Sequence, residues 1–283
     1  MSADNEYGKL RKVLLCKPDY YEWQPINETA RKTISEGQSF TIEEAQKQHQ
    51  EFSDAFKSVG VEIVYIEPVK GLYYQQYTRD LGKMTEEGAL LGRFRWPMRQ
   101  GETSASEKLF IDQGISIFGK VSKGFFEGGD VHYMDSETVA CGLADRSDRE
   151  GIEEARKMFK EGLGLNLITV ELPAKFIHLD EVFVRVADRV CLAHPPALPD
   201  FFLKMLKDKK IEIVEVPEEE VMELKCNVVA IDDKTTMSFK KNVNVNRKLE
   251  ALGFEVLKPD ISIFTRGGGG PRCSCFPLER DEV

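Results

Sequence analysis

Short apolar runs rich in β-branched residues recur along the chain, and each has the length of a buried strand. Four of the five runs follow a glycine, the residue favoured just beyond the last turn of a helix. Successive runs lie roughly fifty residues apart, so the pattern predicts one structural unit repeated five times. The positions that open the runs are Gly60, Gly114, Gly164, Lys210 and Gly253.

Helical patterns precede several of these positions. Thr41 and Glu44 have the spacing of a capping box, and apolar residues follow at steps of three and four as far as Phe56. A second helix is predicted from Ser147, with a buried stripe that ends at Phe159. Turn-forming residues after the strands predict hairpins, with turns at Glu86–Gly88, Asp135–Ser136, Ala187–Asp188 and Asp232–Asp233.

The predicted unit therefore consists of helix, strand, loop and hairpin. Five such units indicate an α/β fold closed around a pseudo-fivefold axis, because an open stack of repeats needs distinct end caps. No Pro/Gly/Ser-rich linker or change in composition interrupts the chain. Residues 1–283 are thus predicted to form a single domain, although the length alone also fits two.

Composition and charge narrow the classes of function. Hydrophobic residues make up 41% and charged residues 31% of the chain, the balance of a globular protein. The formal net charge of −9 argues against nucleic acid and anionic membrane as partners. No apolar run approaches the ~20 residues of a membrane span. The six cysteines are scattered, which favours reduced thiols in a cytoplasmic protein, and a homo-oligomer is left open.

In each unit, the residues least typical of a hydrophobic core follow the strand at nearly the same number of positions along the sequence. In a closed ring these five loops would converge and bring carboxylates, a histidine and a thiol to one point, as a catalytic site requires. The glycine run of the last loop is interpreted as backbone that approaches a ligand closely. The five motifs are Thr78-Arg79-Asp80, Glu127-Gly128-Gly129-Asp130, His178-Leu179-Asp180, Cys226, and the segment Gly267–Cys273.

These strings, in this order, resemble the signatures of the guanidine-modifying (pentein) superfamily, and most closely those of the arginine deiminases. The resemblance runs from about Gly8 to Leu278 and implies a pentein α/β propeller of five ββαβ-type units. It also implies a hydrolase that cleaves a C–N bond in the guanidinium group of arginine or an N-substituted arginine. Thiolate and imidazole supply the chemistry, so neither a metal nor another cofactor is expected.

Other branches of the superfamily are alternatives. Dimethylarginine dimethylaminohydrolases share a string similar to Glu-Gly-Gly-Asp, but they usually lack the Asp that follows His178-Leu179 here. Bacterial deiminases carry a helical insertion for which this chain has no room, whereas dimethylargininases and arginine dihydrolases are short. The dihydrolases carry Asn at the position of Asp80, which argues for a single hydrolysis here, to citrulline and ammonia when the substrate is arginine.

The chemistry of a guanidinium group assigns a role to each motif. Its carbon is a poor electrophile, so an enzyme must hold the planar cation, attack the carbon and protonate the departing nitrogen. Cys273 is the predicted nucleophile, as a thiolate that forms an amidino-thioether. His178 is the predicted proton carrier, oriented by Glu127. Asp80 and Asp180 are predicted to clamp the N–H edges by charge-assisted hydrogen bonds.

Further residues are expected to complete the substrate site. Asp130 is grouped with the substrate-binding residues as a support behind the histidine. Arg146 and Arg99 lie where arginines of the family bind the α-carboxylate of the substrate, which would make that substrate an amino acid. A solvated surface position explains Arg99 equally well. Asn27 resembles an asparagine of the arginine dihydrolases and is expected to line the mouth of the site.

Alternative interpretations concern the thiol and the type of function. Cys275 lies on the same strand face as Cys273 and is the second candidate nucleophile. The Cys-x-Cys pair also resembles half a metal site, but no other Cys or His pair has ligand spacing. An amidinotransferase would use the same chemistry, although its family usually lacks Glu-Gly-Gly-Asp. A non-catalytic propeller similar to the ribosome anti-association factor would lack the Cys-His-Asp set that this chain keeps.

Overall fold

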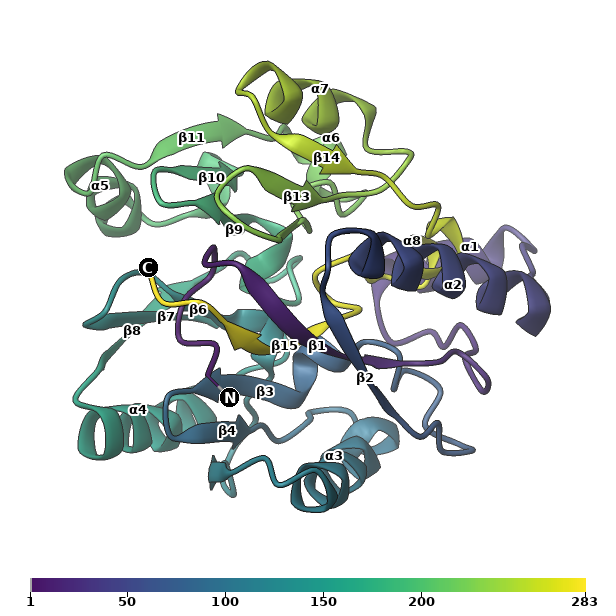
Figure 1. Ribbon diagram of the computed structural model, residues 1–283, viewed down its shortest axis with the longest axis horizontal. Coiled ribbons are helices and arrows are strands. Elements are labelled where there is room, and N and C mark those ends of the chain that lie inside the picture. Colours follow the sequence, from purple (N-terminus) through teal and green to yellow (C-terminus); the bar gives the residue numbers. More distant parts are fainter. Residues whose placement is uncertain (1) are drawn as a thin grey trace.

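Five three-stranded sheets are arranged around the centre of the molecule in the computed structural model, which describes residues 2–283 (Figure 1). The first sheet contains β15 (Phe276–Arg280), β1 (Leu10–Cys16) and β2 (Glu62–Ile66), and the second contains β3 (Gly82–Thr85), β4 (Gly88–Leu91) and β5 (Ile117–Lys120). The third contains β6 (Val131–Tyr133), β7 (Thr138–Leu143) and β8 (Asn166–Glu171), and the fourth contains β9 (Phe183–Ala187), β10 (Val190–Ala193) and β11 (Glu212–Glu215). The fifth contains β12 (Val229–Ala230), β13 (Thr235–Met237) and β14 (Glu255–Leu257). The helices are α1 (Glu28–Ser35), α2 (Ile42–Ser58), α3 (Gln100–Asp112), α4 (Arg149–Leu163), α5 (Asp200–Asp208), α6 (Glu218–Val221), α7 (Val243–Ala251) and α8 (Ser262–Arg266).

All five sheets have the same topology. The central strand pairs antiparallel with one neighbour and parallel with the other. The parallel strand comes next in the sequence after a helix, since a parallel pair requires a crossover connection. The predicted five-unit α/β fold is confirmed, and the hairpin turns fall at the four predicted places. In the first sheet the antiparallel neighbour of β1 is β15, from the opposite end of the chain, and this pairing closes the ring.

The residues that open the apolar runs all have left-handed backbone conformations. Gly60, Gly114, Gly164 and Gly253 have φ between 65° and 90°, and each follows the end of a crossover helix. Lys210 occupies the corresponding place after α5 with φ 55°, although it carries a side chain. The prediction of helix ends at these positions is therefore confirmed, and Lys210 adopts a conformation that costs an L-residue roughly 1–2 kcal/mol.

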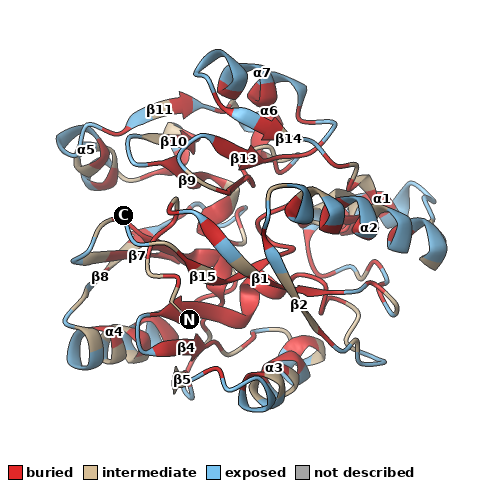
Figure 2. Ribbon diagram, viewed as in Figure 1, coloured by how far each residue is buried: buried red, intermediate tan, exposed pale blue. Residues whose placement is uncertain are grey.

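The crossover helices present an apolar stripe to the sheets and a polar face outwards (Figure 2). In α4 the stripe consists of Ile152 and Phe159 together with Ala155, none more than 2% exposed. Helix α2 begins with the predicted capping box at Thr41, and His49 is buried on its apolar stripe. The packing of the crossover helices against the edges of the sheets thus fixes the positions of the loops that connect helices and hairpins.

All six cysteines are free and buried, as expected for reduced thiols. Among residues 2–283, no helix combines the length and the apolar character needed to cross a bilayer. The cytoplasmic location inferred from cysteine usage stays a prediction.

Candidate active site

Short 3-10 helices carry three of the predicted motifs into one pocket. The segments Thr78–Leu81, Gly128–Asp130 and Leu179–Glu181 each precede the first strand of a hairpin. A turn ahead of β15 brings in Cys273. Three of the five motifs line a small cavity of about 20 Å³, and Glu127 of a fourth contacts the lining residue His178. Cys226 of the remaining motif does not line it. The cavity is lined by Ile26, Asn27, Tyr74, Tyr77, Asp80, Arg99, Arg146, Ile177, His178, Asp180, Glu181, Gly268 and Cys273.

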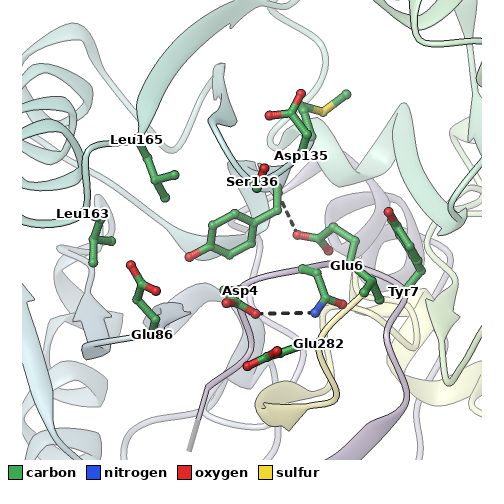
Figure 3. Close-up of a pocket in the computed structure, with 13 residues that line it drawn as sticks. Asp4, Glu6, Tyr7, Glu86, Asp135, Ser136, Leu163, Leu165 and Glu282 are labelled. Atoms are coloured by element: carbon green, nitrogen blue, oxygen red, sulfur yellow. Dashed lines mark hydrogen bonds between the residues drawn. The ribbon is translucent and has the colours of Figure 1, made fainter.

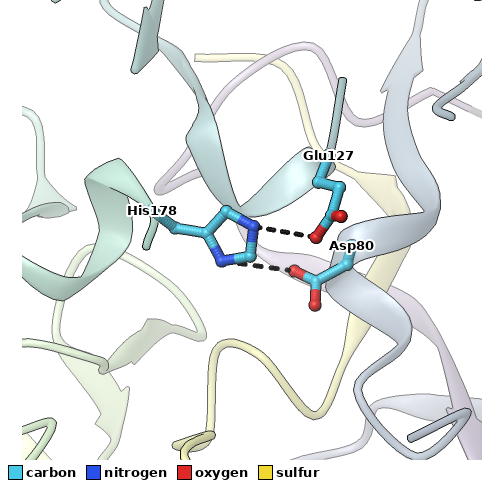
Figure 4. Close-up of side chains that lie close together, drawn as sticks. All are labelled: Asp80, Glu127 and His178. Atoms are coloured by element: carbon cyan, nitrogen blue, oxygen red, sulfur yellow. Dashed lines mark hydrogen bonds and ion pairs between the residues drawn. The ribbon is translucent and has the colours of Figure 1, made fainter. Parts of the chain in front are cut away.

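His178 lies between two carboxylates. Its Nε2 atom is 3.1 Å from Oε2 of Glu127, and its Nδ1 atom is 3.8 Å from Oδ1 of Asp80 (Figure 4). Burial lowers the pKa of the imidazole, but Asp80, Asp130 and Glu127 outweigh this effect and raise the pKa to about 10. His178 is therefore protonated at neutral pH and able to donate a proton.

The Cys273 thiol is 6% exposed and faces the clamp aspartates. Its Sγ atom lies 3.8 Å from Oδ2 of Asp180, and its backbone N–H donates to Oδ1 of Asn227 at 3.1 Å. Burial, followed by the charges of Asp180 and Asp80, raises the pKa of the thiol well above its ordinary value. In the unliganded site Cys273, the predicted nucleophile, is thus a thiol and not the expected thiolate.

Asp80 and Asp180 are each paired with an arginine. Arg99 Nη1 donates to Oδ2 of Asp80 at 2.7 Å, and Arg272 Nη1 donates to Oδ2 of Asp180 at 2.9 Å. Burial raises the pKa of Asp80, but His178 and Arg99 outweigh it and lower the pKa below the ordinary value. The Oδ1 atom of each aspartate is buried without a hydrogen-bond partner among residues 2–283.

The two predicted carboxylate-binding arginines differ in what they contact. Arg146 Nη2 donates to the Ile26 carbonyl at 2.9 Å, and its Nε to Asp145 at 2.9 Å, while the side chain borders the cavity. Arg99 is 2% exposed and forms ion pairs with Asp80 and Glu102. The surface position considered for Arg99 is wrong, since this side chain is buried among protein carboxylates.

The side chains of Asn27 and Asp130 form hydrogen bonds within the protein. Asn27 lines the cavity as predicted, accepts from the Ala30 N–H at the start of α1, and donates to the Gly267 carbonyl. Asp130 is not among the lining residues, because its oxygens accept from the Leu179 N–H at 2.9 Å and from the Ser147 hydroxyl at 2.6 Å. Its position agrees with a support behind His178 and not with a substrate contact.

The glycine run before Cys273 approaches protein side chains closely. A Cβ atom would lie 2.5 Å from Asn27 at Gly268, 2.1 Å from the Tyr77 ring at Gly269, and 2.6 Å from Asn227 at Gly270. Gly268 alone of these three lines the cavity. The expectation of backbone close to a ligand stays a prediction for Gly268, which borders the cavity, while the other two glycines are required by packing.

Sequence reasoning missed residues that hold the reactive groups. Asn227 binds the Cys273 backbone but lies one residue beyond Cys226, the position that the repeat singled out. Arg272 directly precedes the predicted nucleophile in the sequence, so this adjacency could have identified it as a residue of the site. Glu102 stands three residues after Arg99, which is the spacing of a helical ion pair.

Cys275 is buried apart from the cavity. Its Sγ atom lies 3.6 Å from Nη2 of Arg79, and the residue does not line the pocket. Burial raises the pKa of its thiol. A second cavity, of about 450 Å³, is lined by acidic and aromatic residues that include Glu6 and Tyr7 (Figure 3). Its described lining contains neither cysteine nor histidine, so the smaller cavity holds the candidate chemistry.

Among residues 2–283, one group of three side chains has the geometry to share a metal ion. Donor atoms of Asp80, Glu127 and His178 lie within 4.8 Å of one another, close enough to share an ion. Metal ligation requires a neutral imidazole, whereas the pKa of His178 is about 10. These residues therefore suit an acid–base role better than a metal site at neutral pH, and the expectation of a metal-free enzyme stays a prediction.

Comparison with known proteins places this site in a family. The family model for eukaryotic N,N dimethylarginine dimethylhydrolases matches residues 18–280. The chain belongs to this family. It is 34% identical over 278 residues to the uncharacterized protein YkgA of Bacillus subtilis (strain 168), covering 98% of this chain and 94% of that protein. It is 25% identical over 325 residues to an arginine deiminase of Listeria welshimeri, covering 99% of this chain and 78% of the deiminase.

Solved structures of the superfamily share the fold. The N-terminal domain of ArgZ, a cyanobacterial arginine dihydrolase bound to product, superposes with a TM-score of 0.83 at 22% identity, covering 96% of this chain and 98% of that chain. DDAH from Pseudomonas aeruginosa, as a cysteine variant complexed with citrulline, gives 0.79 at 20% identity, with 95% and 99% covered. The family member described here is thus a pentein amidinohydrolase, and the predicted superfamily and enzyme class are confirmed.

Proposed function

We propose that this chain hydrolyses a C–N bond in the guanidinium group of arginine or an N-substituted arginine, most like an arginine deiminase. The observation that carries the proposal is the pair of buried carboxylate oxygens on Asp80 and Asp180 that accept no hydrogen bond from residues 2–283, beside the Cys273 thiol. Leaving such acceptors unpaired costs on the order of 1–3 kcal/mol each. A planar cation with N–H groups on both edges satisfies both of them.

Binding of the cation prepares the nucleophile. The carboxylates that raise the pKa of Cys273 are neutralised by a guanidinium group between them, so the thiol loses its proton more readily once substrate is bound. The thiolate attacks the guanidinium carbon and forms an S–C bond. His178, protonated and held by Glu127, gives its proton to the departing nitrogen, which leaves as ammonia or an amine.

The second half of the reaction restores the enzyme. Water adds to the carbon of the thioether while His178 takes one of its protons. The C–S bond breaks, the sulfur leaves as a thiolate and a ureido product is released. Arg146 and Asn27, which border the same cavity, are proposed to receive the amino-acid end of the substrate.

The family match makes an N-methylated arginine the second candidate substrate. The matching family model is described for dimethylarginine, whereas the first relatives of named activity at 24–27% identity are arginine deiminases. Both reactions give a ureido product, and they differ in whether ammonia or an alkylamine leaves. Asp80 stands where the resemblance to arginine dihydrolases would place Asn, which supports one hydrolysis and not two.

The test is turnover by the purified chain on arginine, mono- and dimethylarginine and agmatine, with separate detection of ureido product and released amine. Cys273→Ser should abolish turnover and retain the fold, while the matched variant Cys275→Ser should keep most of it. Substrate-derived mass trapped on Cys275 would overturn the assignment of the nucleophile. Absence of ureido product from every compound would overturn the proposed function.

A further inference from the structure

The two clamp aspartates are oriented in the same way. Each accepts from an arginine through Oδ2, at 2.7 Å for Asp80 and Arg99 and at 2.9 Å for Asp180 and Arg272. In each, Oδ1 accepts no hydrogen bond among residues 2–283. In each aspartate one oxygen is thus fixed by an arginine and the other accepts no hydrogen bond, although Oδ1 of Asp80 faces Nδ1 of His178 at 3.8 Å. The two aspartates come from different units of the ring.

A buried glutamate lies behind Arg99. Glu102 accepts from Nε and from Nη2 of Arg99, both at 2.9 Å, in a bidentate pair. The Tyr74 and Tyr77 carbonyls also accept from Nη2, so Nη1 is the group left for Asp80. Glu102 is fully buried in the first turn of α3. Asp80, Arg99 and Glu102 form a continuous row, called here the Asp80 row.

A second buried glutamate lies behind Arg272. Oε2 of Glu6 is 3.5 Å from Nη2 of Arg272, whose Nη1 binds Asp180. Glu6 is itself held by Lys83 and by the Tyr133 N–H at 3.0 Å. It lies in the segment that precedes β1, far from Arg272 in the sequence. Asp180, Arg272 and Glu6 form the Asp180 row.

From this geometry we infer that Glu102 and Glu6 are positioning residues, each of which orients one clamp aspartate through its arginine. The inference rests on the proposed function, in which these aspartates bind a guanidinium group. Each arginine donates a charge-assisted hydrogen bond to its buried aspartate and fixes its rotamer. Each glutamate prevents the arginine from turning toward the ligand.

The Asp80 row has a consequence for specificity. With Nε and Nη2 bound to Glu102 and Nη1 bound to Asp80, Arg99 has no free edge for the carboxylate of an amino-acid substrate. Selection for that carboxylate then falls to Arg146, which borders the cavity without a bidentate carboxylate partner. Arg99 serves the guanidinium end of the site.

Double-mutant cycles test the two rows. Arginine affinity is measured calorimetrically on the full chain carrying Cys273→Ser, and kcat/KM is measured on the parent with arginine and agmatine. Glu102→Gln should weaken binding by about 10- to 100-fold, as a misplaced contact does. In the Asp80→Asn background, Glu102→Gln should weaken arginine binding little further. In the Asp180→Asn background, it should weaken binding by the full factor. Glu6→Gln should show the reverse pattern, and both variants should affect arginine and agmatine alike.

Glu220→Gln is the matched control, because Glu220 is buried and paired with Lys225 outside both rows. It should leave affinity unchanged in every background. Equal losses from Glu102→Gln in Asp80→Asn and Asp180→Asn would overturn the inference, since a general structural defect is additive. If the parent is active and Glu102→Gln and Glu6→Gln leave the affinity for arginine unchanged, the inference is also overturned. A parent that neither binds nor converts any guanidino compound would overturn the proposed function, and the inference with it.

Discussion

At the scale of single residues, Arg146 offers a way to separate recognition of the proposed substrate from its chemistry. Arg146 borders the cavity, and its side chain bonds to Asp145 and to the Ile26 carbonyl and not to Cys273 or His178. Arg146→Ala should therefore raise KM for arginine with little effect on kcat, and it should change agmatine turnover little because agmatine has no carboxylate. Steady-state kinetics on both compounds measure this. An equal loss of kcat/KM on the two would leave Arg146 as a structural residue.

His178 should make the stability of the fold depend on pH. Its folded-state pKa is about 10, against 6.5 for an ordinary histidine, because surrounding carboxylates outweigh burial. The raised pKa contributes stability that is fully present below about pH 6.5 and lost as pH rises through about 10. The free energy of unfolding of the parent minus that of His178→Gln should therefore fall over this range in urea titrations.

His49 supplies the control for that measurement. Burial lowers its pKa to about 4, so it is neutral in both states above pH 6.5. The stability difference between the parent and His49→Gln should stay constant between pH 7 and pH 10. A parallel fall for both histidines would assign the pH effect to other groups and contradict the charge balance described for His178.

At the scale of elements, Lys210 is the one helix-end position where the repeat departs from glycine. Its exposed side chain gains little from the structure, while its φ of 55° is strained for an L-residue. Lys210→Gly should raise the free energy of unfolding by about 0.5–1 kcal/mol, because relief of roughly 1–2 kcal/mol exceeds the added entropy of the unfolded chain. Urea unfolding measures the change.

Gly164→Ala is the matched change in the opposite direction. A Cβ at Gly164 meets no atom within 4 Å, so only the backbone conformation (φ 71°) is penalised. A loss of about 1 kcal/mol is expected. If the Gly164→Ala variant proved as stable as the parent, backbone strain would not explain the recurrence of glycine at these helix ends.

Local signals explain which elements were predictable. Capping at Thr41, glycine after the crossover helices and the hairpin turns each depend on a few neighbouring residues, so periodicity and turn chemistry located them. The Asp180 row lay beyond such reasoning, because Glu6 and Arg272 are 266 residues apart. Asn227 was missed by one position, since a loop without regular structure does not preserve the spacing of the repeat.

At the scale of the whole molecule, the ring explains how a site is assembled from distant parts of the sequence. Identical topology in five sheets directs the loops before the hairpins to one place. A count of residues from each helix end therefore predicted Asp80, His178, Asp180 and Cys273 in the cavity lining, but not its tyrosines and isoleucines. Charge pairing was not predictable in this way. Whether Arg99 binds a ligand or Asp80 depends on Glu102, which the motif did not include.

The pairing of β15 with β1 makes the proposed activity depend on completion of the fold. The segment that inserts β15 beside β1 also carries Cys273, so the proposed nucleophile reaches the pocket only when the last gap between sheets is filled. A chain cut before Gly267 would lack both, and four intact sheets would enclose an incomplete cavity. Under the proposed mechanism, activity therefore depends on closure of the ring, because a ring without the segment that carries β15 keeps His178 and both aspartates but lacks Cys273.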